Sequence, residues 1–233
     1  MLAKDVMTRE VITVKPETAV RDIAATLLER HISAVPVSAD GRSVIGIVSE
    51  GDLMRRPEAD TDGTPRSWWL NLFGGTDDLA SEFRKTHGRT AADVMTKNPI
   101  VVDETMPVAE VARTMEKNGI KRVPVVRDGA LVGIVSRANL LRELATRPDA
   151  SLAPLSKPDG DIRERFMAVL ADQGWADRSL INATVSNGVV HLWGLARTRE
   201  QAEAYGVAAR GITGVKGVEN HIGLIGHNYY WAE

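Results

Sequence analysis

The sequence predicts a mixed α/β (α+β) protein with two copies of a β-α-β-β-α unit and a smaller C-terminal domain of order α-β-β-α-β. The first observation behind this prediction is that several short motifs occur twice in the same order. The second is a stretch at 146–160 containing prolines and serines, which is typical of a linker. The third is Asn187-Gly188 between two alternating apolar runs, a strong signal for a two-residue hairpin.

The composition is that of an ordinary globular chain and argues against several classes of function. The 233 residues are 43% hydrophobic and 26% charged, with a net charge of -2. This balance argues against a protein that mainly grips a nucleic-acid backbone. The absence of cysteine excludes disulfides, thiolate nucleophiles and Cys-bound zinc. Apolar runs too short for a membrane helix, and a charged N-terminus without a signal-peptide core, predict a cytoplasmic protein.

The internal repeat covers residues 1–55 and 90–145. One copy is too small to bury both faces of its own sheet, which explains why the copies occur as a pair. The repeated motifs are Asp5-Val6-Met7-Thr8, which returns as Asp93-Val94-Met95-Thr96, and Gly46-Ile47-Val48-Ser49, which returns as Gly133-Ile134-Val135-Ser136.

Each element of the first copy has a local signal. A helix begins after Pro16, because the apolar residues from Val20 to Leu28 recur at helical spacing. Asp40-Gly41 predicts a hairpin turn, and Ser49 precedes a second helix. Strands are predicted where β-branched residues gather, at 11–14, 34–37 and 44–48.

The unit that closes with Gly-Ile-Val-Ser-x-x-Asp resembles a CBS domain, and the pair resembles a CBS tandem, or Bateman module. The resemblance implies a pseudo-symmetric tandem that binds an adenine nucleotide and forms a homodimer. It also implies that adenosine lies between the first strand and the proline-containing second strand of a repeat. The matching residues are Ile12, Thr13, Ala34, Val35, Pro36, Ser49 and Asp52 in the first copy, and Ile100, Val101, Lys121, Arg122, Val123, Pro124, Ser136, Arg137 and Asn139 in the second.

The Ser-x-x-Asp motif at Ser49 and Asp52 has two interpretations. In the structural one it is a capping box, in which the two side chains satisfy backbone N–H groups at a helix start. In the functional one the hydroxyl meets a phosphate and the carboxylate accepts the hydroxyls of a ribose. The occurrence of the motif inside a repeated CBS-like unit favours the functional interpretation.

The two copies differ at the positions that matter for a nucleotide. Asn139 stands where the first copy has Asp52, and an amide lacks the strength of a charge-assisted hydrogen bond. The second copy alone has Lys121, Arg122 and Arg137, which suit a phosphate chain or else mark an exposed charged strand edge. We therefore predict that the first copy binds the ribose and that the second contributes to phosphate binding.

The insert at 56–89 begins as a polar loop and then contains Trp68 and Trp69. These tryptophans either cover the edge of the tandem core or form a dimer contact or a lid beside the ligand.

Residues 161–225 resemble a BON domain in the order of their elements and in their glycines, which implies attachment to phospholipid or membrane surfaces. A membrane surface needs a clustered basic patch. The basic residues near the helices are interleaved with acidic ones and are interpreted as a mixed charged surface; they are Arg163, Arg165, Arg197, Arg199 and Arg210. Residues 226–233 form an aromatic tail.

We therefore expect a non-catalytic regulatory sensor. Its tandem binds AMP, ADP, ATP or a related adenosyl ligand, with or without Mg, and transmits the bound state to the BON-like domain or a partner. The alternative is a membrane-surface or scaffold protein in which the BON-like domain binds phospholipid and the CBS pair mainly dimerises. Nucleic acid is not expected as a partner. No metal site is predicted, because no metal-ligand spacing is found among His31, His87, His191, His221 and His227.

Overall fold

The computed structural model describes residues 1–54, 88–146 and 157–225. The predicted role of Trp68 and Trp69 therefore lies outside the described residues. The chain forms two compact units: unit 1 comprises Met1–Glu10, Val102–Val125 and Val132–Glu233, and unit 2 comprises Val11–Val101 and Val126–Leu131. No helix in the described ranges is both long enough and apolar enough to cross a membrane.

Unit 2 is built on a three-stranded sheet of order β1-β2-β3. The antiparallel strands β1 and β2 pair Val35 with Val48. The predicted strand at 11–14 is reduced to an isolated parallel bridge, because only Val14 bonds to the neighbouring strand region, through Pro36 O and Ser38 N. The elements are α2 (Val20–Glu29), β1 (Ala34–Val37), β2 (Gly46–Ser49), α3 (Glu50–Leu53), α6 (Ala91–Val94) and β3 (Thr96–Lys97).

The core of unit 2 lies between α2 and the sheet. Ile23 and Leu27 of α2 pack with Val35 and Val48, as their helical spacing predicts. Val94 of α6 joins the same cluster, although it comes from the second copy of the repeated motif. Burial of this apolar stripe is what stabilises a helix of only ten residues.

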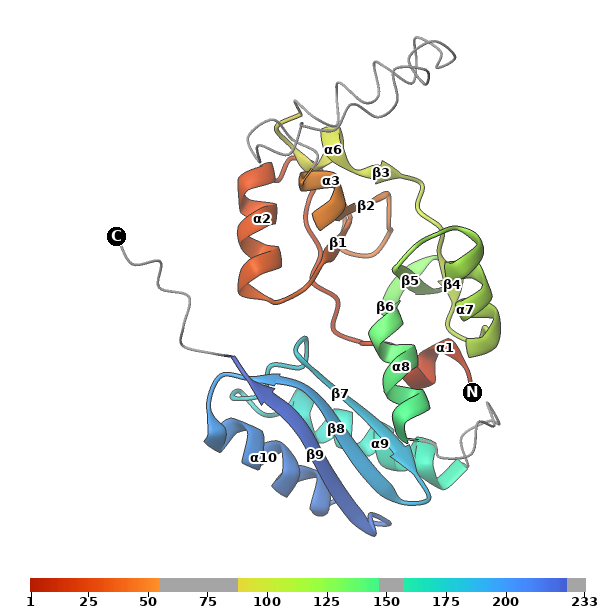
Figure 1. Cartoon of the computed structure of the whole chain (residues 1–233), viewed down its shortest axis with the longest axis vertical. Helices are drawn as coiled ribbons and strands as arrows, with labels where there is room; N and C mark the ends of the chain where they lie inside the picture. Colours follow the sequence, from red (N-terminus) through yellow and green to blue (C-terminus); the bar gives the residue numbers. More distant parts are fainter. Residues whose placement is uncertain (55–87, 147–156, 226–233) are drawn as a thin grey trace. The chain divides into compact units, whose positions relative to one another are not determined.

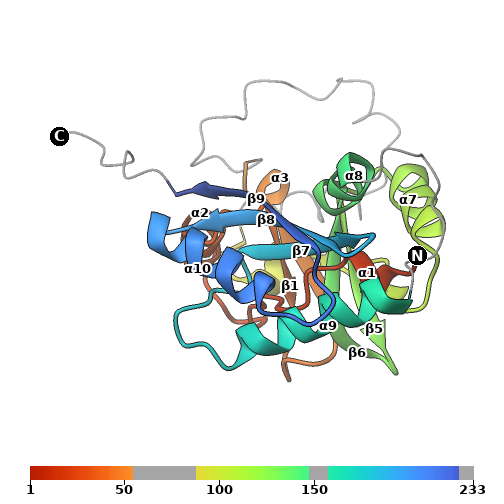
Figure 2. The same ribbon diagram turned by 90° about the horizontal axis from the view of Figure 1, so that it is seen from below.

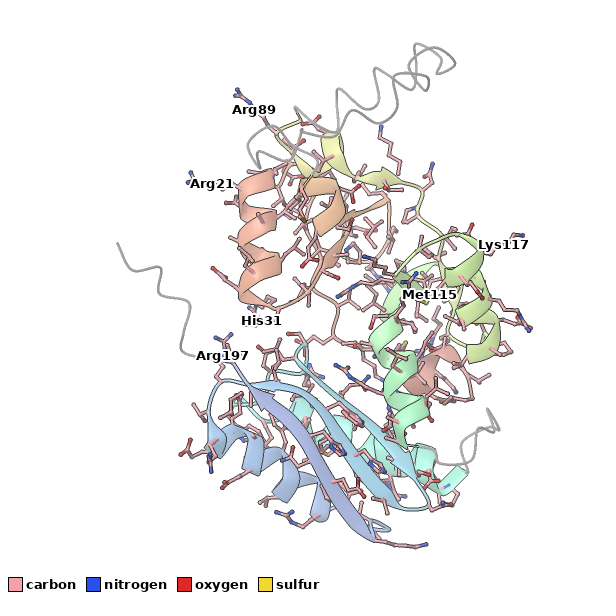
Figure 3. All side chains as sticks on the ribbon, in the orientation of Figure 1. Arg21, His31, Arg89, Met115, Lys117 and Arg197 are labelled. Atoms are coloured by element: carbon pink, nitrogen blue, oxygen red, sulfur yellow. The ribbon has the colours of Figure 1, made fainter. Side chains whose placement is uncertain are left out.

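Most of the second repeat lies in unit 1, around a sheet of order β4-β5-β6. Val111 and Met115 of α7 are buried beside Val123 and Val135 of the sheet, and Figure 3 labels Met115. Helices α7 and α8 lie side by side (Figures 1 and 2). The elements are α1 (Ala3–Val6), β4 (Val102–Asp103), α7 (Val108–Lys117), β5 (Arg122–Arg127), β6 (Ala130–Ser136) and α8 (Arg137–Thr146).

The two copies of the Asp-Val-Met-Thr motif are exchanged between the sheets. Thr8 exchanges backbone hydrogen bonds with Ile134, at 3.0 and 2.9 Å, so the N-terminal segment joins the second repeat. Thr96 pairs with Ile47 in the same way, so the later copy joins the first repeat. The compact units therefore follow different boundaries from the repeats in the sequence.

Two glycines make room for this exchange. A Cβ on Gly133 would lie 2.2 Å from the sulfur of Met7, and a Cβ on Gly46 would lie 2.3 Å from the sulfur of Met95. Both methionines are buried, so each packs directly onto the strand where its glycine stands.

We expect Gly133→Ala to lower the free energy of unfolding by about 1–3 kcal/mol, because the added methyl group overpacks the buried Met7. Urea unfolding followed by circular dichroism measures the change. Gly160→Ala is the control, because nothing lies within 4 Å of that position and alanine is the better helix former. A Gly133→Ala protein as stable as the control protein would contradict this account of the Met7 contact.

The C-terminal domain, also within unit 1, has the predicted order α-β-β-α-β (Figure 1). Strands β7 and β8 are antiparallel, whereas β9 runs parallel to β8 after the crossover through α10. Phe166, Leu192 and Tyr205 are among the buried residues that join both helices to one face of the sheet. The elements are α9 (Lys157–Ala171), β7 (Ile181–Ser186), β8 (Val189–Ala196), α10 (Arg199–Arg210) and β9 (Gly217–Leu224).

The predicted hairpin at Asn187-Gly188 is present and has an additional support. Both residues have positive φ angles, 53° and 83°, as a type I′ turn requires. The buried carboxylate of Asp159 accepts hydrogen bonds from Asn187 N at 3.1 Å and Gly188 N at 2.8 Å. The helix α9 thereby fixes the turn that sets the register of the sheet. The predicted α+β fold class is confirmed.

Candidate functional site

Ser49 and Asp52 meet at the junction of β2 and α3. Asp52 Oδ2 accepts hydrogen bonds from Ser49 N at 2.9 Å and Ser49 Oγ at 2.7 Å, so the capping box is formed. Both bonds use Oδ2, and within the described part of the chain no partner is found for Oδ1 of this half-buried side chain. The cap therefore leaves one carboxylate oxygen available to accept hydroxyl groups.

The other predicted residues of the first repeat surround this junction along the sheet. Ala34 lies directly opposite Ser49 in the β1–β2 register, and Pro36 O accepts a hydrogen bond from Val14 N at 3.1 Å. Ala34, Val35 and Pro36 are buried, whereas Ile12 and Thr13, which precede Val14, are half-buried. The structure thus brings these first-copy residues into one region of unit 2. Ile100 and Val101 are exposed and belong to unit 2, whereas the other predicted ligand residues of the second copy belong to unit 1.

Ser136 and Asn139 form the matching junction of the second repeat, but the Asn139 side chain has further hydrogen-bond partners. Asn139 Oδ1 accepts hydrogen bonds from Ser136 N and Ser136 Oγ. Its amide nitrogen donates to Val6 O at 3.0 Å and reaches Thr8 Oγ1 at 3.4 Å. The side chain is 3% exposed. Asn139 is therefore committed to holding the N-terminal segment in place, a role that a carboxylate, which has no donor, cannot take.

The basic residues of the second repeat lie at the start of β5 and at the start of α8. Arg137 N donates to Lys121 O at 3.1 Å, which joins the start of α8 to the residue before β5. The Lys121 and Arg137 side chains are exposed, and Arg122 is half-buried. Val123 and Pro124 continue β5 into the core and are buried. This hydrogen bond brings Lys121 and Arg137 close together, and Arg122 is the next residue along the chain.

Arg163 is a buried residue whose role the sequence does not predict. It was expected on a mixed charged surface, and this is wrong, because the side chain is 2% exposed. Its guanidinium donates to Ala183 O at 2.8 Å, Lys4 O at 3.2 Å and Met7 O at 3.0 Å. Residue 163 stands three positions before the buried Phe166, so helical spacing places both on one face.

Burial of the charged Arg163 guanidinium carries a desolvation cost. Burial lowers the pKa of the guanidinium to about 10, with repulsion from Arg9 as a second cause. The residue remains charged at neutral pH. It is stabilised by carbonyl groups at the C-terminal end of α1, where a helix leaves its carbonyls unpaired and carries partial negative charge.

Asn182 of β7 adds a second link between the C-terminal domain and the second repeat. Its side-chain oxygen accepts from Arg163 at 3.1 Å, and its amide nitrogen donates to Val6 O at 3.1 Å. Val6 O is also the acceptor for Asn139. One carbonyl therefore receives hydrogen bonds from the repeat motif and from the C-terminal domain. Two ion pairs, Arg9–Glu164 and Arg178–Glu10, flank this contact at 3.5 and 3.1 Å.

The chain matches two protein families. Residues 3–59 and 91–146 match the CBS domain, and residues 158–225 match the BON domain. The CBS domain-containing protein CBSX2, chloroplastic, of Arabidopsis thaliana is 33% identical over 138 residues, which is 55% of this chain and 56% of that protein. The uncharacterized protein MJ1426 of Methanocaldococcus jannaschii is 31% identical over 158 residues, which is 62% of this chain and 91% of that protein.

The structural comparison agrees with these matches. A crystal structure of CBSX2 in complex with AMP is similar with a TM-score of 0.54 and 31% sequence identity, over 63% of this chain and 98% of that one. The chain spans a little over half the length of the Arabidopsis relative. Both resemblances predicted from the sequence are confirmed: the chain belongs to the CBS-domain family, with a tandem of CBS repeats followed by a C-terminal BON domain.

Proposed function

We propose that the chain is a regulatory sensor whose CBS pair binds an adenine nucleotide or a related adenosyl ligand. The observation that carries this proposal is the Ser49–Asp52 junction, where the cap occupies Oδ2 and leaves Oδ1 to accept hydroxyl groups. The likeness to CBSX2, which is solved in complex with AMP, supports the class of ligand.

In this proposal the two repeats have different tasks. Asp52 accepts the ribose hydroxyls, and the apolar residues Ala34, Val35 and Pro36 provide contacts for the purine. Within the second repeat, Lys121, Arg122 and Arg137 provide positive charge that suits phosphate groups. Asn139 is assigned a structural task, because its amide is used by Val6 and Ser136. The sensor acts as a homodimer through its CBS pair.

The hydrogen bonds at Val6 O provide a route by which the second repeat communicates with the BON domain. Asn139 follows Ser136 at the start of α8, and its donor shares Val6 O with Asn182 of the BON sheet. A ligand that displaces the Ser136–Asn139 junction changes one of the two bonds at this carbonyl. For such a change to act as a switch, the ligand must bind one arrangement of the junction more tightly than the other.

A panel of adenine and guanine ligands tests the proposed function by thermal shift, with calorimetry on each hit. A ligand that binds the native state raises the melting temperature with its concentration, and at 100 times its Kd it stabilises by about 2.7 kcal/mol. We expect adenine compounds to raise the melting temperature and guanine compounds at equal concentration to leave it unchanged. If no ligand of the panel shifts the melting temperature, the sensor proposal is overturned and the membrane-surface alternative remains. Liposome co-sedimentation in the absence of nucleotide tests that alternative.

A further inference from the structure

Three residues from two neighbouring strands of the BON domain meet on one face of its sheet. His191 lies on β8, and Glu219 and His221 lie on β9. The parallel register places His191 beside Glu219 and Trp193 beside His221. Val190 and Leu192, which alternate with His191 along β8, face the helices, so the three residues lie on the opposite face.

Two of the three separations match those between the ligands of a shared metal ion. Glu219 Oε2 lies 3.2 Å from His191 Nδ1 and 3.5 Å from His221 Nε2. One ligand atom from each residue falls within 4.8 Å of the others. A zinc ion has bonds of about 2.0–2.2 Å to nitrogen and carboxylate oxygen, so its tetrahedral ligands stand roughly 3.3–3.6 Å apart. Small rotamer adjustments therefore bring the three side chains to a single ion.

Both histidine rings stack against another ring. His221 stacks on Trp193, with ring centroids 4.1 Å apart and an angle of 16°, and Trp193 Nε1 donates to Thr184 Oγ1 at 3.3 Å. The rings of His191 and His221 are nearly parallel, at 4°. His191 is buried, whereas Glu219 and His221 are exposed, so an ion and a water molecule have access from one side.

We propose that His191, Glu219 and His221 bind a divalent transition metal ion of the zinc class. Two imidazole nitrogens and one carboxylate oxygen suit zinc, whereas magnesium and calcium prefer all-oxygen sites. Three protein ligands leave a fourth position for water. The ion links β9, an edge strand of the sheet, to β8, because both strands provide ligands. This site does not depend on the proposed nucleotide sensing.

Calorimetric titration of Zn²⁺ into the whole chain tests the proposal, with Mg²⁺ as the comparison ion. We expect saturable Zn²⁺ binding, weakened more than tenfold by His221→Ala and by Glu219→Gln. The control is His31→Asn, because His31 is an exposed histidine of unit 2 that Figure 3 labels. Asparagine tolerates the positive φ of 50° at that position.

Cobalt substitution provides a second readout. Co²⁺ at this site is expected to give visible absorption bands that disappear in His221→Ala and remain in His31→Asn. Melting curves recorded without metal show whether each variant is folded. The proposal is overturned if the parent chain binds no Zn²⁺ saturably, or if folded His221→Ala and Glu219→Gln proteins bind it as tightly as the parent.

Discussion

Arg163→Ala is expected to lower the free energy of unfolding by about 3–4 kcal/mol, the largest stability effect of any single substitution considered for this chain. The change removes the donor for Ala183 O, Lys4 O and Met7 O. Each buried acceptor left without a partner costs about 1–3 kcal/mol, and water entering the vacated space recovers part of the sum. Removal of the buried charge also relieves a desolvation cost, which keeps the net effect below the sum of the lost bonds.

Thermal unfolding measures this effect, and we expect the melting temperature to fall by roughly 6–15 °C for a chain of this size. Arg165→Ala is the matched control, because Arg165 is an exposed arginine on the same helix, α9. Its removal is expected to change stability by less than about 0.5 kcal/mol. Equal melting temperatures for the two variants would show that the buried hydrogen bonds of Arg163 contribute little.

A double-mutant cycle separates the two donors that share Val6 O. Asn139→Ala and Asn182→Ala each remove one donor from this carbonyl, while the other donor remains. If each bond supports the other, the effects on stability are not additive, and a coupling of about 0.5 kcal/mol or more is expected. Additive effects would mean that the CBS motif and the BON domain contact the same carbonyl without energetic communication.

Local signals in the sequence predict those parts of the fold that depend on neighbours in the chain. The apolar spacing of α2 and the Asn187-Gly188 turn are examples, because helix periodicity and positive φ angles are local properties. The predicted strand at 11–14 is too long, because within the described part of the chain Val14 is the residue of this segment that forms a bridge to another strand. The exchange of the Asp-Val-Met-Thr segments was not predicted, because a repeat shows which segments are alike but not which sheet each one joins.

At the candidate site, too, local sequence signals predict local contacts but not contacts between distant residues. The Ser49–Asp52 cap could be predicted from the spacing of two residues, and it is present. Arg163 was assigned to the surface because it is charged, although its spacing from Phe166 places it on the buried face of α9. His191 and His221 show no metal-ligand spacing, because the parallel register of β8 and β9 alone brings them together. Arg163 and this pair of histidines have in common that their partners are distant in sequence.

Asp52→Ala is expected to weaken binding of an adenine nucleotide by about 10–100-fold, the range given by the loss of one hydrogen bond to a charged group. Asn139→Ala is expected to weaken it by less than about threefold, while lowering the free energy of unfolding by about 1–3 kcal/mol. The two substitutions thus separate a ligand-binding carboxylate from a structural amide at equivalent positions of the repeats.

Loss of the cap is a competing cause for any effect of Asp52→Ala, and Asp93→Ala controls for it. Asp93 Oδ2 accepts hydrogen bonds from Thr90 N at 3.0 Å and Thr90 Oγ1 at 2.8 Å. This capping box lies in the same unit as Asp52, and neither of its two residues is a predicted ligand residue. Both variants should lose about 0.5–2 kcal/mol of stability, but only Asp52→Ala should lose affinity in calorimetry. Asp52→Asn should fall between Asp52→Ala and the parent, because an amide oxygen still accepts a hydroxyl without the charge. If Asp93→Ala weakened binding as much as Asp52→Ala, the carboxylate would act only through the helix start, and the ribose assignment would be wrong.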